Sequence, residues 1–213
     1  MDAQQMTIPG MEGKWMSRGE LFCDDCGKSH VHMSLPPLLR LLLLSDGTVT
    51  HFLKTLFSET IAFELKEQSE IVISDEDANR LSLPKGEKVI KRQGWLTIKS
   101  RQTRVLYVSS ILPFSRLSPP LYQEIIVGEK PLGQIIDDQK LLFRRDLIEI
   151  GHFSLPEISR EFRSPSDPLI WARRYRLTLS GDVSALLFEA ISPDIADFII
   201  DNKACDVPLG KTK

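Results

Sequence analysis

The chain has little cysteine and no long apolar run, and both shortages restrict what it can be. Its 213 residues include three cysteines, an odd number, which argues against a disulfide framework and for a reducing compartment. The most apolar run, 35–44, contains two prolines and an arginine and is much shorter than the roughly 20 apolar residues of a membrane span. Residues 1–13 lack the basic start and apolar core of a secretory signal. We therefore expect a cytoplasmic protein without a membrane span.

A strong net charge and the common catalytic motifs are also absent. Lys and Arg number 27 against 29 Asp and Glu, so no overall field favours nucleic acid or an anionic membrane. No Gly-x-Gly-x-x-Gly or P-loop occurs, which excludes the usual nucleotide sites. No Gly-x-Ser-x-Gly elbow occurs, and the four histidines lie in unrelated contexts. Any anion site must therefore be built from local clusters of charge.

The composition is that of an ordinary globular domain, with 42% apolar and 26% charged residues. Residues 1–34 are polar and weakly periodic, and we interpret them as an N-terminal extension. Residues 35–200 carry the periodic apolar patterns of a domain, and residues 201–213 form a C-terminal tail. We expect one domain with short appendages.

Helix and strand patterns are mixed along that domain. Apolar spacing predicts helices over 35–44, 49–57, 75–81 and 118–127, and a short one after Pro131-Leu132-Gly133. Alternation predicts strands over 61–66, 71–73, 89–99, 104–112, 141–150, 171–181 and 186–191. Residues 153–168 are interpreted as a proline-punctuated connection. Because consecutive strands form hairpins, the pattern favours an α+β fold with an antiparallel sheet.

The last two predicted strands carry the most informative charges. Glu189 is the only charge in the run 186–191, and buried carboxylates need a partner. Alternation on the preceding strand puts Arg174 and Arg176 on one face and Arg173 on the other. If the strands pair across 180–182, carboxylate and guanidinium groups meet on one sheet and suit a small anionic ligand. A structural salt bridge and a solvated arginine face are the alternatives.

Arg92 is a second candidate, on the predicted strand 89–99. It shares a face with Gly94 and two apolar residues, so its guanidinium needs an anionic partner. A structural carboxylate and a ligand carboxylate held bidentately both satisfy that need. Asp46-Gly47-Thr48 likewise has two interpretations. It caps a helix, and its free backbone N–H groups would also suit a carboxylate.

The N-terminal extension holds one candidate metal site, formed by Cys23, Cys26, His30 and His32. These residues supply two cysteine and two histidine ligands within ten residues, as a tetrahedral zinc site requires. The ligands are crowded, however, and no second pair follows a dozen or more residues later. A polar extension with free thiols is therefore the simpler interpretation, and we expect no metal. Cys205 has no evident catalytic partner.

Ordered segments over about 35–193 resemble the chorismate pyruvate-lyase family. They are, in order, Leu43-Leu44-Ser45-Asp46-Gly47-Thr48-Val49-Thr50, the strand around Arg92, Ser109-Ser110-Ile111-Leu112-Pro113, Pro131-Leu132-Gly133, Arg145-Asp146-Leu147-Ile148-Glu149-Ile150-Gly151, Trp171 to Gly181 and Leu187-Phe188-Glu189-Ala190. The resemblance implies an α+β fold in which an antiparallel sheet and flanking helices enclose an internal pocket. It also implies elimination of pyruvate from chorismate to give 4-hydroxybenzoate, without metal or organic cofactor.

The resemblance assigns roles to individual residues as well. The family's key arginine, which grips the ring carboxylate, corresponds to Arg92. Its key glutamate, near the ring oxygen, corresponds to Glu189, and we expect both to be catalytic. Backbone groups that contact the ligand in the family correspond to Thr48, Val49 and Leu132.

One position departs from the family pattern. Well-studied members carry a second ligand-binding arginine where this chain has Ser109, and Arg174 or Arg104 are the candidates to compensate. We expect Ser109 and Arg174 to bind substrate. We also expect burial to raise the pKa of Glu189, so that a protonated carboxyl acts as general acid or hydrogen-bond donor.

Three functions follow from these observations. The first is a chorismate lyase, monomeric or homodimeric, that supplies 4-hydroxybenzoate for ubiquinone or related aromatic biosynthesis. The second is a non-catalytic binding protein for small aromatic carboxylates on the same fold, which loss of the second arginine would fit. The third is a zinc-stabilised interaction module built on the extension, which bound zinc in the purified protein would favour. None of the three involves nucleic acid.

Overall fold

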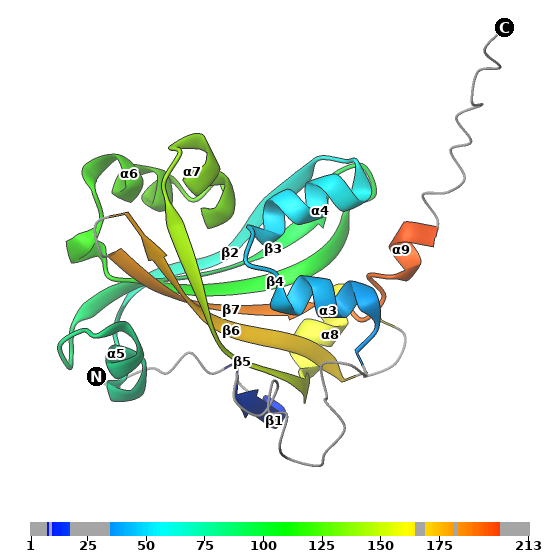
Figure 1. Cartoon of the computed structure of the whole chain (residues 1–213), viewed down its shortest axis with the longest axis horizontal. Coiled ribbons are helices and arrows are strands. Elements are labelled where there is room, and N and C mark those ends of the chain that lie inside the picture. Colours follow the sequence, from blue (N-terminus) through cyan, green and yellow to red (C-terminus); the bar gives the residue numbers. More distant parts are fainter. Residues whose placement is uncertain (1–7, 9, 18–34, 165–168, 181–182, 201–213) are drawn as a thin grey trace, which may run out of the picture.

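A single antiparallel sheet forms the centre of the molecule (Figure 1). The computed structural model describes residues 8, 10–17, 35–164, 169–180 and 183–200. Seven strands in these residues pair in the order β1-β5-β6-β7-β4-β3-β2. They are β1 (Glu12–Ser17), β2 (Ile61–Val72), β3 (Lys88–Ile98), β4 (Thr103–Leu112), β5 (Phe143–Ser154), β6 (Ile170–Leu179) and β7 (Val183–Ile191). The expected α+β class with an antiparallel sheet is confirmed.

Helices cover both faces of the sheet. They are α3 (Pro37–Leu44), α4 (Val49–Phe57), α5 (Asp75–Leu81), α6 (Pro119–Val127), α7 (Leu132–Asp138), α8 (Pro156–Phe162) and α9 (Asp197–Ile200), with a 3-10 turn, η1, at Phe114–Arg116. The core has three parts. On one face, α3 and α4 pack over one half of the sheet, and α6 and α7 pack over the other half. On the opposite face, α5 and α8 pack against aromatic residues.

Strict alternation along β7 assigns its residues to the two faces. Leu186 and Phe188 belong to the aromatic core under α5 and α8. Leu187 and Ile191 belong to the cores under the other four helices, and Glu189 lies between them on that same face. Because side chains alternate with a period of two, the register fixes which charged residue faces which core.

The structure also contains elements that differ from those predicted from the sequence. The connection 153–168 contains α8, which begins with Pro156 at its first turn, where a missing N–H costs nothing. The segments 61–66 and 71–73 form one continuous strand, β2, with a bulge between Leu65 and Glu67. Residues 12–17, interpreted as extension, add β1 alongside β5. Among the described residues, no helix has the length and hydropathy to cross a bilayer.

Close packing at Gly94 gives a test of the sheet. A Cβ there would lie 2.6 Å from the backbone oxygen of Glu64 and 2.6 Å from the Phe63 ring. We expect Gly94→Ala to lower the free energy of unfolding by about 1–3 kcal/mol, because backbone of the edge strand must shift. Gly47→Ala is the matched control: a Cβ at that position meets nothing within 4 Å. Urea unfolding of both variants measures the difference, and equal stabilities would contradict this packing.

Candidate functional site

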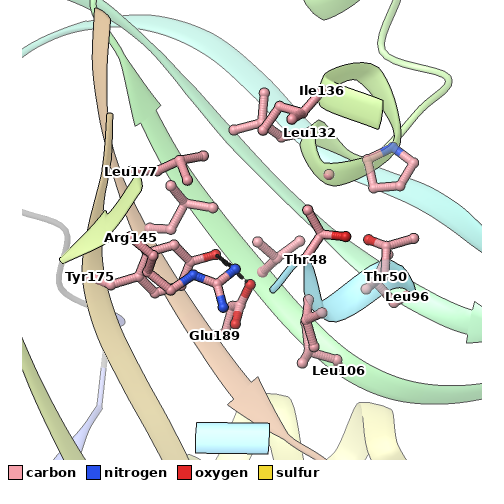
Figure 2. A pocket seen from close by; sticks show the side chains of 15 residues that line it. Thr48, Thr50, Leu96, Leu106, Leu132, Ile136, Arg145, Tyr175, Leu177 and Glu189 are labelled. Atoms are coloured by element: carbon pink, nitrogen blue, oxygen red, sulfur yellow. Dashed lines mark hydrogen bonds between the residues drawn. The ribbon is translucent and has the colours of Figure 1, made fainter. Parts of the chain in front are cut away.

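A pocket lies on the sheet between the two groups of helices. The first turns of α4 and α7 form one side, and strands β3 to β7 form the rest (Figure 2). Most of the wall is apolar, and it includes Leu96, Leu106, Val108, Ile136, Leu177 and Leu187. The charged side chains lie at one end, where Arg145 and Glu189 lie together with Tyr175 in Figure 2. Such a pocket suits a small ring with polar substituents at defined positions.

Glu189 is the centre of the polar end. The hairpin of β6 and β7 places Arg173 directly opposite Glu189, and both side chains are 1–2% exposed. The Nε of Arg173 donates to Oε2 of Glu189 at 2.7 Å. The hydroxyl of Tyr175 donates to Oε1 at 2.7 Å. Both carboxylate oxygens therefore accept a hydrogen bond, as burial of a charge requires.

The protonation of Glu189 is the reverse of the sequence-based expectation. Burial alone would raise the pKa of its carboxyl, but the charges of Arg173 and Arg145 and the hydrogen bonds from Tyr175 and Arg173 outweigh it. The pKa of Glu189 is therefore lowered, and the carboxyl is ionised at neutral pH. Burial also raises the pKa of the Tyr175 hydroxyl, which keeps its proton and remains a donor. The expected raised pKa of Glu189, on which a general-acid role would depend, is therefore contradicted.

The two arginines share a backbone acceptor at the end of α3. Arg173 Nη1 donates to the carbonyls of Leu43 and Ser45, each at 3.2 Å. Arg145 Nη1 donates to the same Ser45 carbonyl at 3.0 Å, and its Nη2 donates to the Tyr175 hydroxyl at 3.3 Å. Carbonyls at a helix C-terminus carry partial negative charge and suit cations. The cluster thus contains two guanidinium groups and one carboxylate, with one positive charge in excess.

Thr48, Val49 and Leu132, whose backbone groups are expected to contact the ligand, all line the pocket. Thr48 and Pro131 precede the first turns of α4 and α7, and neither side chain caps its helix. The two helix starts approach each other at Gly133, where a Cβ would lie 3.1 Å from the Thr50 hydroxyl. The uncapped N–H groups at the start of α4 therefore lie beside the pocket, where they favour an anion.

Arg92 lies on the pocket face of the sheet but behind the pocket wall. It is 2% exposed, and its register partners are Ser110 on β4 and Gln68 on β2. Its Nη2 donates to the carbonyl of Lys130 at 3.0 Å, immediately before α7, and its guanidinium lies 5.2 Å from the centre of the Phe63 ring. Burial lowers the pKa of Arg92 to about 10, so it remains a cation at neutral pH. In this state Arg92 holds the segment that leads into α7.

The strand register contradicts the expectation that Ser109 and Arg174 bind substrate in the pocket. Both pair with Phe188, which faces the aromatic core, so both side chains lie on the sheet face opposite the pocket. Arg174 instead pairs with Glu149 at 3.1 Å and stacks 4.7 Å from the centre of the Trp15 ring. Neither residue is placed to bind a ligand in the pocket.

Arg104 does not compensate either, because Glu64 and Glu161 hold it. Sequence reasoning missed Arg145 and Tyr175 as functional candidates. Arg145 opens the matched segment 145–151, and Tyr175 lies two residues after Arg173, so strand alternation was the available signal.

The candidate zinc ligands Cys23, Cys26, His30 and His32, like Cys205, lie outside the described residues. Within the residues that the structure describes, no group of three or more His, Cys, Asp or Glu is arranged to hold a metal ion.

The buried pair makes stability depend on pH. We expect Glu189→Gln to lower the free energy of unfolding at pH 7 by about 3 kcal/mol, because it leaves the Arg173 charge without its partner. The pKa of Glu189 is lower in the folded chain than in the unfolded chain, where it is about 4.3. The stabilisation is therefore complete above that value and is lost as the pH falls through the folded pKa.

Urea unfolding between pH 7 and about pH 3 measures this difference, which should shrink on acidification. Glu70→Gln is the control, because Glu70 pairs with Lys88 on the surface and should contribute less than about 1 kcal/mol. A difference for Glu189→Gln that grows on acidification would contradict an ionised carboxyl.

The chain was compared with curated protein sequences, solved structures and protein families. No curated protein sequence matches it. PhnF from Mycobacterium smegmatis is 18% identical with a TM-score of 0.58, over 71% of this chain and 66%, just under two thirds, of that chain. The effector domain of the same protein is 17% identical, over 71% and 92% of the two chains, with a TM-score of 0.57. The ligand-binding domain of a GntR-family regulator from Bordetella bronchiseptica is 15% identical, over 63% and 86%, with a TM-score of 0.52.

At these identities the solved structures show a shared fold and nothing further. The family comparison goes further, because the model described as "Chorismate pyruvate-lyase Rv2949c-like" matches residues 43–199. That match covers more than half of the chain and includes both helix starts, Arg145 and the β6–β7 hairpin. The protein therefore belongs to the Rv2949c-like chorismate pyruvate-lyase family.

Proposed function

We propose that the protein is a chorismate pyruvate-lyase, which eliminates pyruvate from chorismate to give 4-hydroxybenzoate. The observation that carries the proposal is the polar end of the pocket, where two guanidinium groups face one ionised carboxylate in an otherwise apolar cavity. The excess positive charge calls for an anionic ligand, since an uncompensated buried charge is costly. Membership in the family supports chorismate as that ligand.

Different parts of the pocket suit the ring, the carboxylate and the hydroxyl group of a cyclic carboxylate such as chorismate. Leucine and valine side chains from β3, β4 and β7 give a flat apolar surface for the ring. The first turn of α4 gives N–H groups for the ring carboxylate. Across the pocket, Glu189 is placed for the ring hydroxyl, to which an ionised carboxylate acts as acceptor. The positive charge of Arg92, which does not line the pocket, attracts the ring carboxylate of the ligand at long range.

The elimination itself is balanced without a co-reactant. The C3–O bond of the enolpyruvyl ether breaks, the proton on C4 is lost, and the ring becomes aromatic. The departing enolpyruvate gains one proton at its methylene carbon to become pyruvate, so atoms and electrons balance. The negative charge of Glu189, which is itself buried, stabilises positive charge that develops on the ring as the C–O bond breaks.

Non-catalytic binding of small aromatic carboxylates is the second candidate function. The shared fold with regulator effector domains favours it, because those structures include a domain described as ligand-binding. The helix starts, the apolar walls and Glu189 would also hold 4-hydroxybenzoate as a bound ligand. The difference between the two functions lies in whether the enolpyruvyl group is cleaved.

The use of the product and the site of action belong to the same proposal. A lyase of this kind would supply 4-hydroxybenzoate for quinone or related aromatic biosynthesis. The odd number of cysteines supports action in the reducing cytoplasm.

Incubation of the purified protein with chorismate tests the proposal directly. Pyruvate and 4-hydroxybenzoate should appear in equal amounts. We expect Glu189→Gln to lower kcat by about 100-fold or more, since it removes charge aimed at the reacting ring. We expect Arg92→Ala to lower kcat/KM by about tenfold or more, since it frees the segment before α7. Thermal unfolding of each variant separates lost chemistry from lost folding.

Ser109→Ala is the control for that experiment, because Ser109 lies on the opposite face and should leave turnover unchanged. Intact chorismate with saturable 4-hydroxybenzoate binding would replace the lyase by the binding protein. Neither turnover nor binding would overturn both functions.

The lowered pKa of Glu189 also predicts the pH profile of turnover. Because the carboxyl is already ionised, its titration should leave kcat flat between about pH 6 and pH 8. A general acid with a raised pKa would instead make kcat fall tenfold for each pH unit above that pKa. Initial rates of pyruvate release across this range distinguish the two, and such a decline, absent in Glu189→Gln, would refute the ionised role.

A further inference from the structure

A lyase acting on chorismate must hold two carboxylates, whereas the product keeps only one. The ring carboxylate is common to both molecules, and the second carboxylate leaves with pyruvate. The position expected to bind the second one, Ser109, lies on the opposite face of the sheet. The pocket must therefore supply another cation.

We propose that Arg145 is the receptor for the enolpyruvyl carboxylate of chorismate, and so the residue that distinguishes substrate from product. The inference rests on the proposed function and deepens it.

Strand alternation directs Arg145 into the pocket. It lies on β5 opposite Leu177 of β6, and both residues line the pocket. Figure 2 shows its side chain beside Tyr175, at the same end as Glu189. Arg144, one residue earlier, has a side chain that is 70% exposed and pairs with Asp146. Of these two neighbouring arginines, Arg145 is therefore a cation of the pocket and Arg144 a cation of the surface.

Arg145 retains donors for a ligand. A guanidinium group has five N–H donors in a fixed plane. One nitrogen donates to the Ser45 carbonyl and another to the Tyr175 hydroxyl, while the buried Nε has no acceptor within the described part of the chain. The guanidinium carbon lies 4.1 Å from the centre of the Tyr175 ring, a cation–π contact that adds to these two hydrogen bonds. The group is held in place before a ligand arrives.

Its charge is also available. Arg173 is matched by Glu189 through a direct contact of 2.7 Å. Asp146, the carboxylate next to Arg145 in the chain, pairs with Arg144 and Arg176 instead. Among the residues that the structure describes, Arg145 makes no direct ion pair of its own. A carboxylate is the ligand group that a partly buried, preoriented guanidinium binds best.

This placement has a consequence for the reaction. A carboxylate held by Arg145 keeps the enolpyruvyl ether near Glu189, at the polar end of the pocket. The same cation then stabilises the enolpyruvate as the C3–O bond breaks. Once pyruvate has left, 4-hydroxybenzoate has no group for Arg145, and the ring carboxylate and apolar walls alone hold the product.

The test compares two ligands in matched variants. Arg145→Gln removes the charge, Arg145→Lys retains it, and Arg144→Gln is the control with the same change on the surface. For each protein, kcat/KM is measured from pyruvate release and Kd for 4-hydroxybenzoate from calorimetry. We expect Arg145→Gln to lower kcat/KM for chorismate about 10- to 100-fold while changing the Kd of 4-hydroxybenzoate less than about threefold. Arg145→Lys should recover part of the loss, and Arg144→Gln should match the wild type.

The outcomes separate the inference from the function on which it rests. Equal weakening of both ligands by Arg145→Gln would assign Arg145 a structural role and overturn the inference, as would unchanged kcat/KM. If the wild type binds chorismate without cleaving it, the lyase fails, and a selective loss of chorismate affinity in Arg145→Gln still supports the receptor. If the wild type neither binds nor cleaves chorismate, the function and the inference fall together.

Discussion

The buried ion pair between Arg173 and Glu189 determines the arrangement of the whole pocket. Two charges in a core cost several kcal/mol each unless their mutual attraction and further hydrogen bonds offset that cost. Here the matching atoms come from the facing strands β6 and β7, from the Tyr175 hydroxyl and from carbonyls at the end of α3. Because each partner is needed to offset the cost, the pair holds the hairpin and the end of α3 in one arrangement. The polar end of the pocket is therefore fixed before any ligand binds.

The Ser45 carbonyl connects the ion pair to the first turns of α4 and α7. It accepts from both Arg173 and Arg145, and the chain runs from it through three residues to the first turn of α4. The close approach of Gly133 to Thr50 then places α7 against α4. The polar end of the pocket and the two helix starts are thus connected through the Ser45 carbonyl, the short chain that follows it and the contact between α4 and α7. The apolar walls between them lower the local dielectric constant and strengthen each of these charge interactions.

The sequence predicted features that depend on neighbours in the chain and missed those that depend on register or on distant charges. The hairpin of β3 and β4, the hairpin of β6 and β7, and α4 follow local periodicity, and the structure has them. Ser109 and Arg174 fell on the opposite face because aligned segments do not reveal which way each strand residue points. The expected pKa direction of Glu189 was wrong because burial is outweighed first by the charge of Arg173, whose pairing with Glu189 depends on the register, and then by Arg145 from the distant strand β5. The strand β1 lies in a segment whose periodicity gave no signal.

Under the proposed function, the difference between binding and turnover depends on a few side chains of the pocket. The helix starts, the apolar walls and Arg92 would act alike on chorismate and on 4-hydroxybenzoate, because both carry the ring carboxylate. Interactions that are equal for substrate, transition state and product add affinity and slow product release, and they do not lower the barrier. Only groups that act on the enolpyruvyl ether or on charge that develops in the ring can favour cleavage. Under the proposed function those groups are Arg145 and Glu189, so the choice between lyase and binding protein rests on the polar end, where the guanidinium group of Arg145 has no carboxylate partner among the described residues.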